Sequence, residues 1–222
     1  MHGLHGLSTQ IINLLAAVLL MVSFAMLSQR RILSLIHLYT VQGIALVAAN
    51  LVLGFVTQDV HLYVSGILTL VLKVGLIPWI LYRLVQRLNV KTDVETLLNI
   101  PTTLLIGIVL VIVAFNVAAP ISQLASSVAR GTLGIALACV LLSFMMMITR
   151  SKALPQVIGF LSMENGLFFA AAAATNGMPM IVELGIGLDV LVGILILGVF
   201  MFQIREQFDS LDIHHLERLK DD

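Results

Sequence analysis

Residues 61–82 read HLYVSGILTLVLKVGLIPWILY, an apolar run with one charged side chain, Lys73, near its centre. An α-helix rises 1.5 Å per residue and the hydrocarbon core of a bilayer is about 30 Å thick, so about 20 apolar residues cross it. This run is therefore long enough to span a membrane. Inserting a lysine at its centre costs at least about 2.5–3.5 kcal/mol, so the charge must serve a purpose inside the protein.

Further apolar runs of similar length lie on both sides of this one. Proline is tolerated in the first turn of a helix and disfavoured in its interior. Pro101, Pro155 and Pro179 are accordingly expected to open spans, and Pro120 to follow one. The predicted spans are 7–28, 32–54, 61–82, 98–119, 130–148, 153–175 and 180–203. The sequence thus predicts an all-α integral membrane bundle of about seven transmembrane helices, forming a single domain.

The composition excludes a water-soluble globular protein. Of the 222 residues, 59% are hydrophobic and 11% charged, and the mean hydropathy is +1.07. Soluble domains are about 45–50% apolar and about 25% charged. The 12 basic and 12 acidic side chains cancel, which gives no reason to expect a nucleic-acid partner. Cys139 is the single cysteine, so no thiolate set exists for zinc or an iron-sulfur cluster, and we expect this chain to bind no cofactor.

The positions of the basic residues predict the orientation, because cytoplasmic loops are enriched in lysine and arginine. Lys73 lies within a span, and Arg130 falls in a connection on the other side from the rest. The basic residues that share one side are Arg30, Arg31, Arg83, Arg87, Lys91, Arg150, Lys152, Arg205, Arg218 and Lys220. The N-terminus is therefore expected outside, and the C-terminus, with a short polar tail at 206–222, in the cytoplasm.

Four polar residues of different spans share one predicted depth. From helical rise, Glu164 lies roughly 15 Å from the cytoplasmic end of its span, and Asp189 roughly 14 Å from the outer end of its own. Lys73 is twelve residues after His61, near the middle of its span, and Gln42 reaches about the same level. These positions predict a polar layer across the bundle at half depth.

Local sequence around Lys73 favours an irregular helix there. Gly66 and Thr69 share a helix face with Lys73, and small residues let a neighbouring helix approach closely. Pro78 has no N–H for the carbonyl of Val74, so we expect a kink one residue from Lys73 and an acceptor for the ammonium or a water.

The polar layer has two interpretations. Carboxylates and a lysine in a low dielectric can exchange protons through water and form a relay. Alternatively, Lys73 pairs with an acid inside the bundle and only fixes helix packing. In the first case, His37 would extend the path toward the cytoplasm and Glu183 toward the outside.

Three segments in the last third of the chain resemble the E component of hydrogenase-4, a membrane subunit of membrane-bound nickel-iron hydrogenase complexes. They read IGFLSMENG at 158–166, VELGIGLD at 182–189 and LDIHHLERLK at 211–220. The resemblance in length and span pattern covers most of the chain, including Lys73 ahead of Pro78. More distantly, the last three spans are similar to the K subunit of respiratory complex I and the C subunit of multisubunit sodium/proton antiporters.

In the complex I relative, two glutamates on consecutive membrane helices belong to the proton path at mid-membrane. By resemblance, Glu164 takes the first position and Asp189 the second, where aspartate sets the carboxyl group one methylene further from its neighbours. The resemblance thus implies that Glu164 and Asp189 are proton-relay residues, with Lys73 as a charge partner or intermediate carrier.

The resemblance also implies the setting of this chain. It would be a non-catalytic subunit of a hydrogenase-type respiratory complex in a prokaryotic cytoplasmic membrane. Antiporter-like membrane subunits would lie beside it, and peripheral hydrogenase subunits would carry the nickel-iron and iron-sulfur centres. Two alternatives stand: a component of a multisubunit cation/proton antiporter without a redox partner, and a purely structural membrane scaffold.

Overall fold

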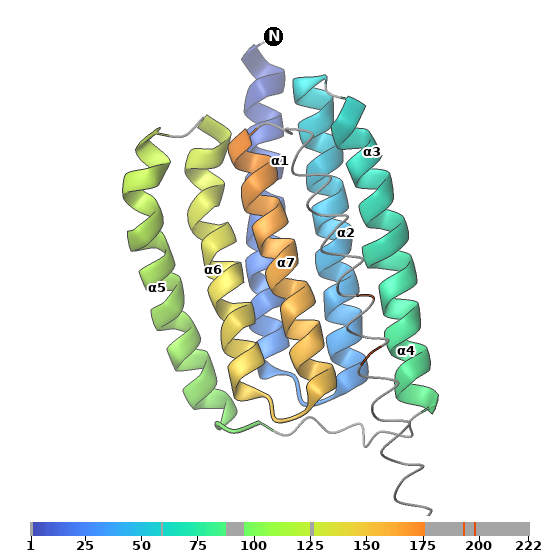
Figure 1. Cartoon of the computed structure of the whole chain (residues 1–222). Helices are drawn as coiled ribbons and strands as arrows, with labels where there is room; N and C mark the ends of the chain where they lie inside the picture. Colours follow the sequence, from blue (N-terminus) through green and yellow to red (C-terminus); the bar gives the residue numbers. More distant parts are fainter. Residues whose placement is uncertain are drawn as a thin grey trace, which may run out of the picture.

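A computed structural model describes residues 2–58, 60–87, 96–124 and 127–175, together with Gly193 and Gly198 (Figure 1). Regular structure in these ranges is helical apart from one isolated bridge between Thr96 and Arg150, which confirms the all-α prediction for them. The predicted span at 180–203 and the tail at 206–222 lie outside the described residues. The helices are α1 (His2–Ser28), α2 (Ile32–Thr57), α3 (Val60–Thr69), the π-helix η1 (Leu70–Leu76), α4 (Ile77–Arg87), α5 (Ile100–Leu124), α6 (Ser127–Thr149) and α7 (Ala153–Thr175).

Five helical stretches among the described residues are long and apolar enough to cross a membrane, as expected for a multi-pass membrane protein. One of them consists of α3, η1 and α4 together, and corresponds to the predicted span 61–82. The stretches are Gly6–Ser28, Ile32–Thr57, Val60–Gln86, Ile100–Pro120 and Gly131–Thr149. Helix α7 has a comparable length but carries Glu164 and Asn165 in its middle, and it packs inside the bundle against α2 and α6.

The helices run roughly side by side, with α5 at one edge of the bundle and α3–α4 at the other (Figure 1). Helices α2 and α6 each contact both α1 and α7, so these four form the centre. Helix α5 packs on α6 and α1, while the α3–η1–α4 span packs on α2. The α2–α7 contact brings residues 42 and 165 within reach of each other.

Buried apolar side chains form two clusters, one toward each end of the bundle. The first includes Tyr39, Leu81 and Leu142, at the end where α1 meets α2. The second includes Leu46 and Phe169, toward the end where α3 begins. The buried polar residues of the site described below lie between the two clusters, so they are enclosed by apolar side chains above and below.

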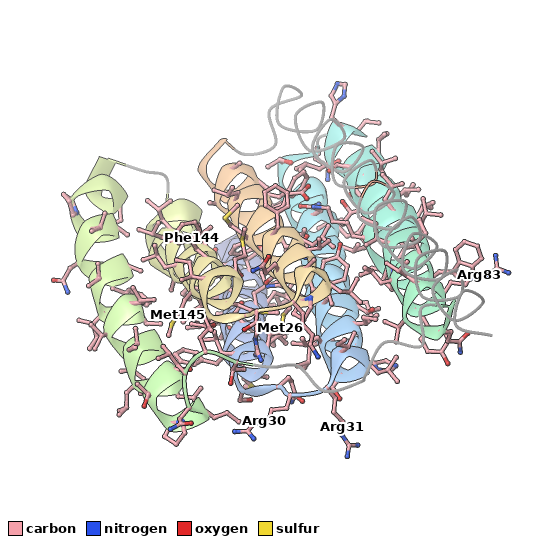
Figure 2. All side chains as sticks on the ribbon, turned by 60° about the horizontal axis from the view of Figure 1, so that its bottom comes forward. Met26, Arg30, Arg31, Arg83, Phe144 and Met145 are labelled. Atoms are coloured by element: carbon pink, nitrogen blue, oxygen red, sulfur yellow. The ribbon has the colours of Figure 1, made fainter. Side chains whose placement is uncertain are left out.

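Basic residues gather at one end of the bundle, as the count of charges predicts. Figure 2 shows Arg30, Arg31 and Arg83 at the end that holds the α1–α2 connection. Arg150 and Lys152 lie in the α6–α7 connection at the same end (Figure 1). Because α6 begins at Ser127, its first turn places the backbone of Arg130 at the opposite end.

The prolines mark the predicted ends of the apolar stretches. Pro101 and Pro155 lie in the first turns of α5 and α7, as expected. The apolar stretch in α5 is Ile100–Pro120, close to the predicted span 98–119, but the helix itself continues past Pro120 to Leu124. Proline removes one backbone hydrogen bond and need not end a helix so close to its C-terminus. Pro179 lies outside the described residues.

Candidate functional site

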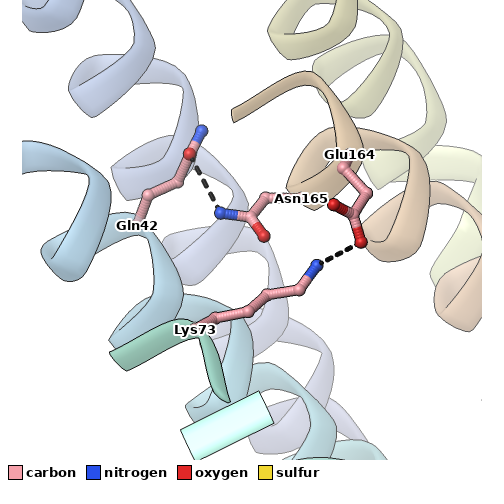
Figure 3. A network of polar contacts seen from close by, with 4 residues as sticks. All are labelled: Gln42, Lys73, Glu164 and Asn165. Carbon is pink, nitrogen blue, oxygen red and sulfur yellow. Dashed lines mark hydrogen bonds and ion pairs between the residues drawn. The ribbon is translucent and has the colours of Figure 1, made fainter. Parts of the chain in front are cut away.

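A buried ion pair joins the α3–η1–α4 span to α7. Lys73 Nζ donates a hydrogen bond to Glu164 Oε1 at 2.9 Å, and the two side chains are 2% and 3% exposed (Figure 3). The Lys73 ammonium also lies 5.5 Å from the ring centroid of Phe168, one turn beyond Glu164 on α7. An aromatic face at this distance stabilises a cation, so Lys73 is held by a carboxylate and a ring from the same helix.

A chain of neutral hydrogen bonds runs beside the ion pair. Asn165 Nδ2 donates to Gln42 Oε1 at 3.2 Å (Figure 3), and Gln42 Nε2 donates to Ser23 Oγ at 3.2 Å. The Ser23 hydroxyl in turn donates to the carbonyl of Leu19 at 2.9 Å. These bonds link α1, α2 and α7 at one level. Because Glu164 and Asn165 are adjacent in sequence, the chain also fixes the part of α7 that carries the carboxylate.

A π-helical segment positions Lys73. The N–H of Ile77 donates to the carbonyl of Leu72, five residues back, which is the hydrogen bond of a π-turn. Pro78 follows directly and has no N–H to offer, so an α-helical bond to Val74 cannot form. The irregularity expected from Pro78 is therefore present as a widened turn. Such turns are frequent at functional sites.

Helix α2 approaches this π-turn closely at Gly43. A Cβ added at Gly43 would lie 3.2 Å from Val74 Cγ2 and 3.6 Å from the carbonyl oxygen of Lys73. A larger residue at position 43 would therefore press on the backbone that carries the ammonium. The glycine lets α2 lie against η1 at the same level as Gln42, which keeps the neutral chain and the ion pair side by side.

The surroundings of the pair suit proton exchange. Burial in a low dielectric penalises both charged groups, and the 2.9 Å contact offsets this penalty while the pair stays intact. Moving the shared proton from Nζ to Oε1 would give a neutral amine and a neutral acid, and such a pair avoids the desolvation cost. The transfer of the proton within the pair therefore leaves no lone charge in the apolar interior.

The structure brings together three of the predicted site residues. Lys73, Glu164 and Gln42 lie at one level, as their depths in the sequence predict. His37 is exposed on α2 and does not join this group. Asp189 and Glu183 lie outside the described residues.

Sequence reasoning missed Ser23, which continues the chain from Gln42 into α1. A lone hydroxyl in an apolar span is a weak signal, because serine often bonds to the carbonyl one turn back. Ser23 does this as well, through Leu19, and acts in addition as the acceptor for Gln42.

Arg150 is a second buried cation, at the basic end of the bundle. Its side chain is 1% exposed, and Nη2 donates to the carbonyls of Met26 and Leu27, at 3.1 and 2.9 Å. These are carbonyls of the last turn of α1, so Arg150 caps that helix. Burial, and secondarily the charge of Arg30, lower the pKa of Arg150 to about 10. The side chain stays protonated near neutral pH and serves packing rather than exchange.

The chain is similar along nearly its whole length to a protein of Mycobacterium tuberculosis (strain ATCC 25618 / H37Rv) described as uncharacterized protein Rv0085. The two are 32% identical over 212 residues, which cover 95% of this chain and 96% of that protein. No protein-family profile and no solved structure matches the chain. The chain belongs to the same family as the mycobacterial protein.

Proposed function

We propose that this chain is the membrane subunit of a hydrogenase-type respiratory complex, and that it carries protons through the middle of the membrane by way of Lys73 and Glu164. The observation that carries the proposal is the buried 2.9 Å pair between these two residues, enclosed by apolar clusters on both sides. An ionisable pair at this depth is costly to insert and is typical of proton relays.

The resemblance of residues 158–166, 182–189 and 211–220 to the hydrogenase-4 E component supports the choice of complex. Electron transfer would take place in peripheral subunits that hold the nickel-iron and iron-sulfur centres. Antiporter-like subunits would lie beside this chain in a prokaryotic cytoplasmic membrane. The basic end with Arg30, Arg31 and Arg83 would face the cytoplasm, because lysine and arginine are retained on that side.

The chemical step is a proton transfer along the hydrogen bond between the two side chains. Lys73 gives its proton to Glu164, which leaves a neutral amine and a neutral carboxylic acid. Glu164 then releases the proton to the next group, for which Asp189 is the candidate, and a new proton restores Lys73. No other bond is made or broken, and the pair returns to its starting charge after each proton.

The test uses the assembled complex in inverted membrane vesicles. Glu164→Gln keeps the size of the side chain and removes its proton exchange, so we expect redox-driven proton translocation to fall while the complex stays assembled. Leu167→Ala, at an exposed position on the same helix, is the matched control and should translocate protons normally. Normal translocation by an intact Glu164→Gln complex would contradict the relay.

Two further outcomes identify the alternative functions. If nickel and iron-sulfur subunits do not copurify with this chain and cation/proton antiporter subunits do, the chain belongs to an antiporter. If the double variant Lys73→Met/Glu164→Leu assembles and translocates protons at the normal rate, the pair is a packing contact and the chain is a scaffold.

A further inference from the structure

Polar residues recur at every fourth position from the beginning of α3 to the ion pair. His61 is exposed at the start of the helix, whereas Ser65, Thr69 and Lys73 are all buried. Residues four apart lie on the same face of a helix, about 6 Å apart along its axis. The four side chains therefore form a stripe that leads from the end of the bundle opposite Arg30 and Arg31 to the ammonium at mid-depth.

The π-turn keeps Lys73 on this stripe. In a regular α-helix four residues rotate by more than one full turn. Each fourth side chain is therefore displaced, or drifts, a little further around the helix axis. A turn closed by an i→i+5 bond holds more residues, so each residue rotates less. The step from Thr69 to Lys73 enters η1 (Leu70–Leu76), so its drift is smaller than in the preceding α-helical steps.

Asn50 lies on the face of α2 that packs against the α3–η1 span. It lies on the same side of α2 as Gly43 and Gly54, at spacings of seven and four residues, and both glycines touch the α3–η1 span. A Cβ added at Gly66 would lie 3.8 Å from Asn50 Cβ. The amide is therefore placed at the level of Ser65 and Gly66, about 12 Å along α2 from Gln42.

The amide of Asn50 is buried and unpaired among the described residues. Its side chain is 0% exposed, and neither Nδ2 nor Oδ1 has a hydrogen-bond partner within the part of the chain that the structure describes. Buried amides almost always pair with protein or with ordered water, because an unpaired donor or acceptor loses the full free energy of its hydration. Ordered water is the usual partner of a buried amide that no protein group pairs with.

We propose that Asn50, Ser65 and Thr69 hold a short chain of water molecules that connects the Lys73–Glu164 pair to the end of the bundle marked by His61. An amide and two hydroxyls supply the two to four polar contacts that a buried water needs. The amide and the two hydroxyls can each donate and accept hydrogen bonds, so they can hold the waters in a connected chain. A proton can pass along such a chain from one water to the next. Its role as a proton route rests on the proposed function, whereas the presence of water does not.

Thiol modification tests the water chain directly. Ser65→Cys is introduced into the full chain in sealed vesicles, and the rate of reaction with a small cationic methanethiosulfonate is measured from each side. Only a hydrated thiol forms the reactive thiolate, so we expect position 65 to react from the His61 side at roughly ten times the rate of Leu62→Cys, a buried apolar site on the same helix. His61→Cys is the exposed control, and the wild-type chain with its buried Cys139 gives the background.

Equal, slow rates of thiol modification at positions 65 and 62 would overturn the water chain.

The second measurement is proton translocation by the Asn50→Leu variant in the assembled complex. We expect translocation to fall while hydrogenase activity persists, and unchanged translocation would contradict the route. These outcomes are separable from the proposed function. If Glu164→Gln translocates normally while Ser65→Cys is modified, the relay fails and the water chain stands. If Glu164→Gln is defective and Ser65→Cys is unreactive, the relay stands and the water chain fails.

Discussion

Lys73 and Glu164 are 91 residues apart in the sequence and form a 2.9 Å ion pair at the boundary between two apolar clusters. The pair connects an edge span to the central helix α7. Each charge therefore depends on a partner from another part of the chain, and both side chains are almost fully buried. This dependence governs how the protein should respond to substitution.

Removing one member of the pair should destabilise the bundle more than removing both. Lys73→Met or Glu164→Leu leaves an uncompensated buried charge, which costs about 3–5 kcal/mol. Lys73→Met/Glu164→Leu leaves none, so most of that loss should be recovered. Thermal unfolding of the three variants in detergent gives the coupling free energy. Additive losses would show that the two side chains do not stabilise each other.

Replacing Gln42 should weaken the contact between α2 and α7. Gln42→Leu removes the acceptor of Asn165 and the donor to Ser23, and buried groups left without partners cost about 1–3 kcal/mol. Val41→Ala, at the neighbouring exposed position, should change stability by less than about 0.5 kcal/mol. Equal unfolding temperatures for the two variants would mean that the neutral chain adds nothing to stability.

The level of the site could be predicted from the sequence, but its pairing could not. A fixed rise per residue places Lys73, Gln42 and Glu164 at one depth, because depth depends on counting alone. Which acid meets the lysine depends on how neighbouring helices are rotated and arranged, and apolar spans with little amphipathic character do not specify that. The π-turn was likewise anticipated only as a kink at Pro78, since the choice of bonding register depends on the packing of α2 at Gly43.

Some differences between expectation and structure have simple geometric causes. His37 precedes Gln42 by five residues, which rotates it by about 140° around α2 and turns it to the exposed side.

Arg150 was counted only as a loop charge that sets orientation. Its capping of α1 joins residues more than 120 positions apart, and nothing in the local sequence around Arg150 indicates this.

The two ends of α2 should face opposite sides of the membrane, with the Arg31 end in the cytoplasm. This follows from the gathering of basic residues at that end and the tendency of cytoplasmic loops to retain them. Arg31→Cys should react with a membrane-impermeant maleimide only in inverted vesicles, and His61→Cys only in intact cells. The reverse pattern would show that the chain is inserted the other way.

Arg150 should stabilise the last turn of α1 through the two hydrogen bonds that Nη2 donates. Arg150→Met removes these hydrogen bonds from a charged group to Met26 and Leu27, with an expected loss of about 1.5–3 kcal/mol. Arg150→Lys should recover only part of it, because an ammonium is more strongly hydrated than a guanidinium and costs more to bury. Thermal unfolding compares the three proteins, and a lysine variant as stable as wild type would show that any buried cation at this position is sufficient.

The pH dependence of this contact follows from the pKa of Arg150, which burial lowers to about 10. Between about 10 and the usual arginine pKa, the unfolded chain binds more protons than the folded one, so the contribution of this group to stability rises with pH there. Below about pH 10 the group is protonated in both states. The stability difference between wild type and Arg150→Met should therefore not change with pH around neutrality, and a strong dependence there would point to another titrating group.

Filling the contact at Gly43 should disturb the ion pair without touching either charge. Gly43→Ala places a Cβ 3.2 Å from Val74 Cγ2, which a small shift can relieve, and the gain in helix propensity of roughly 1 kcal/mol over glycine offsets the crowding. Gly43→Val adds two methyl groups toward η1 and the carbonyl of Lys73, and overpacking of this kind costs about 1–3 kcal/mol. Gly66→Ala is the matched control, since its nearest neighbour would lie at an ordinary 3.4 Å. We expect Gly43→Val alone among the three to lower both the unfolding temperature and redox-driven proton translocation, because moving η1 lengthens the Lys73–Glu164 contact. If Gly43→Val lowers stability and leaves translocation intact, the position of the π-turn does not govern the relay.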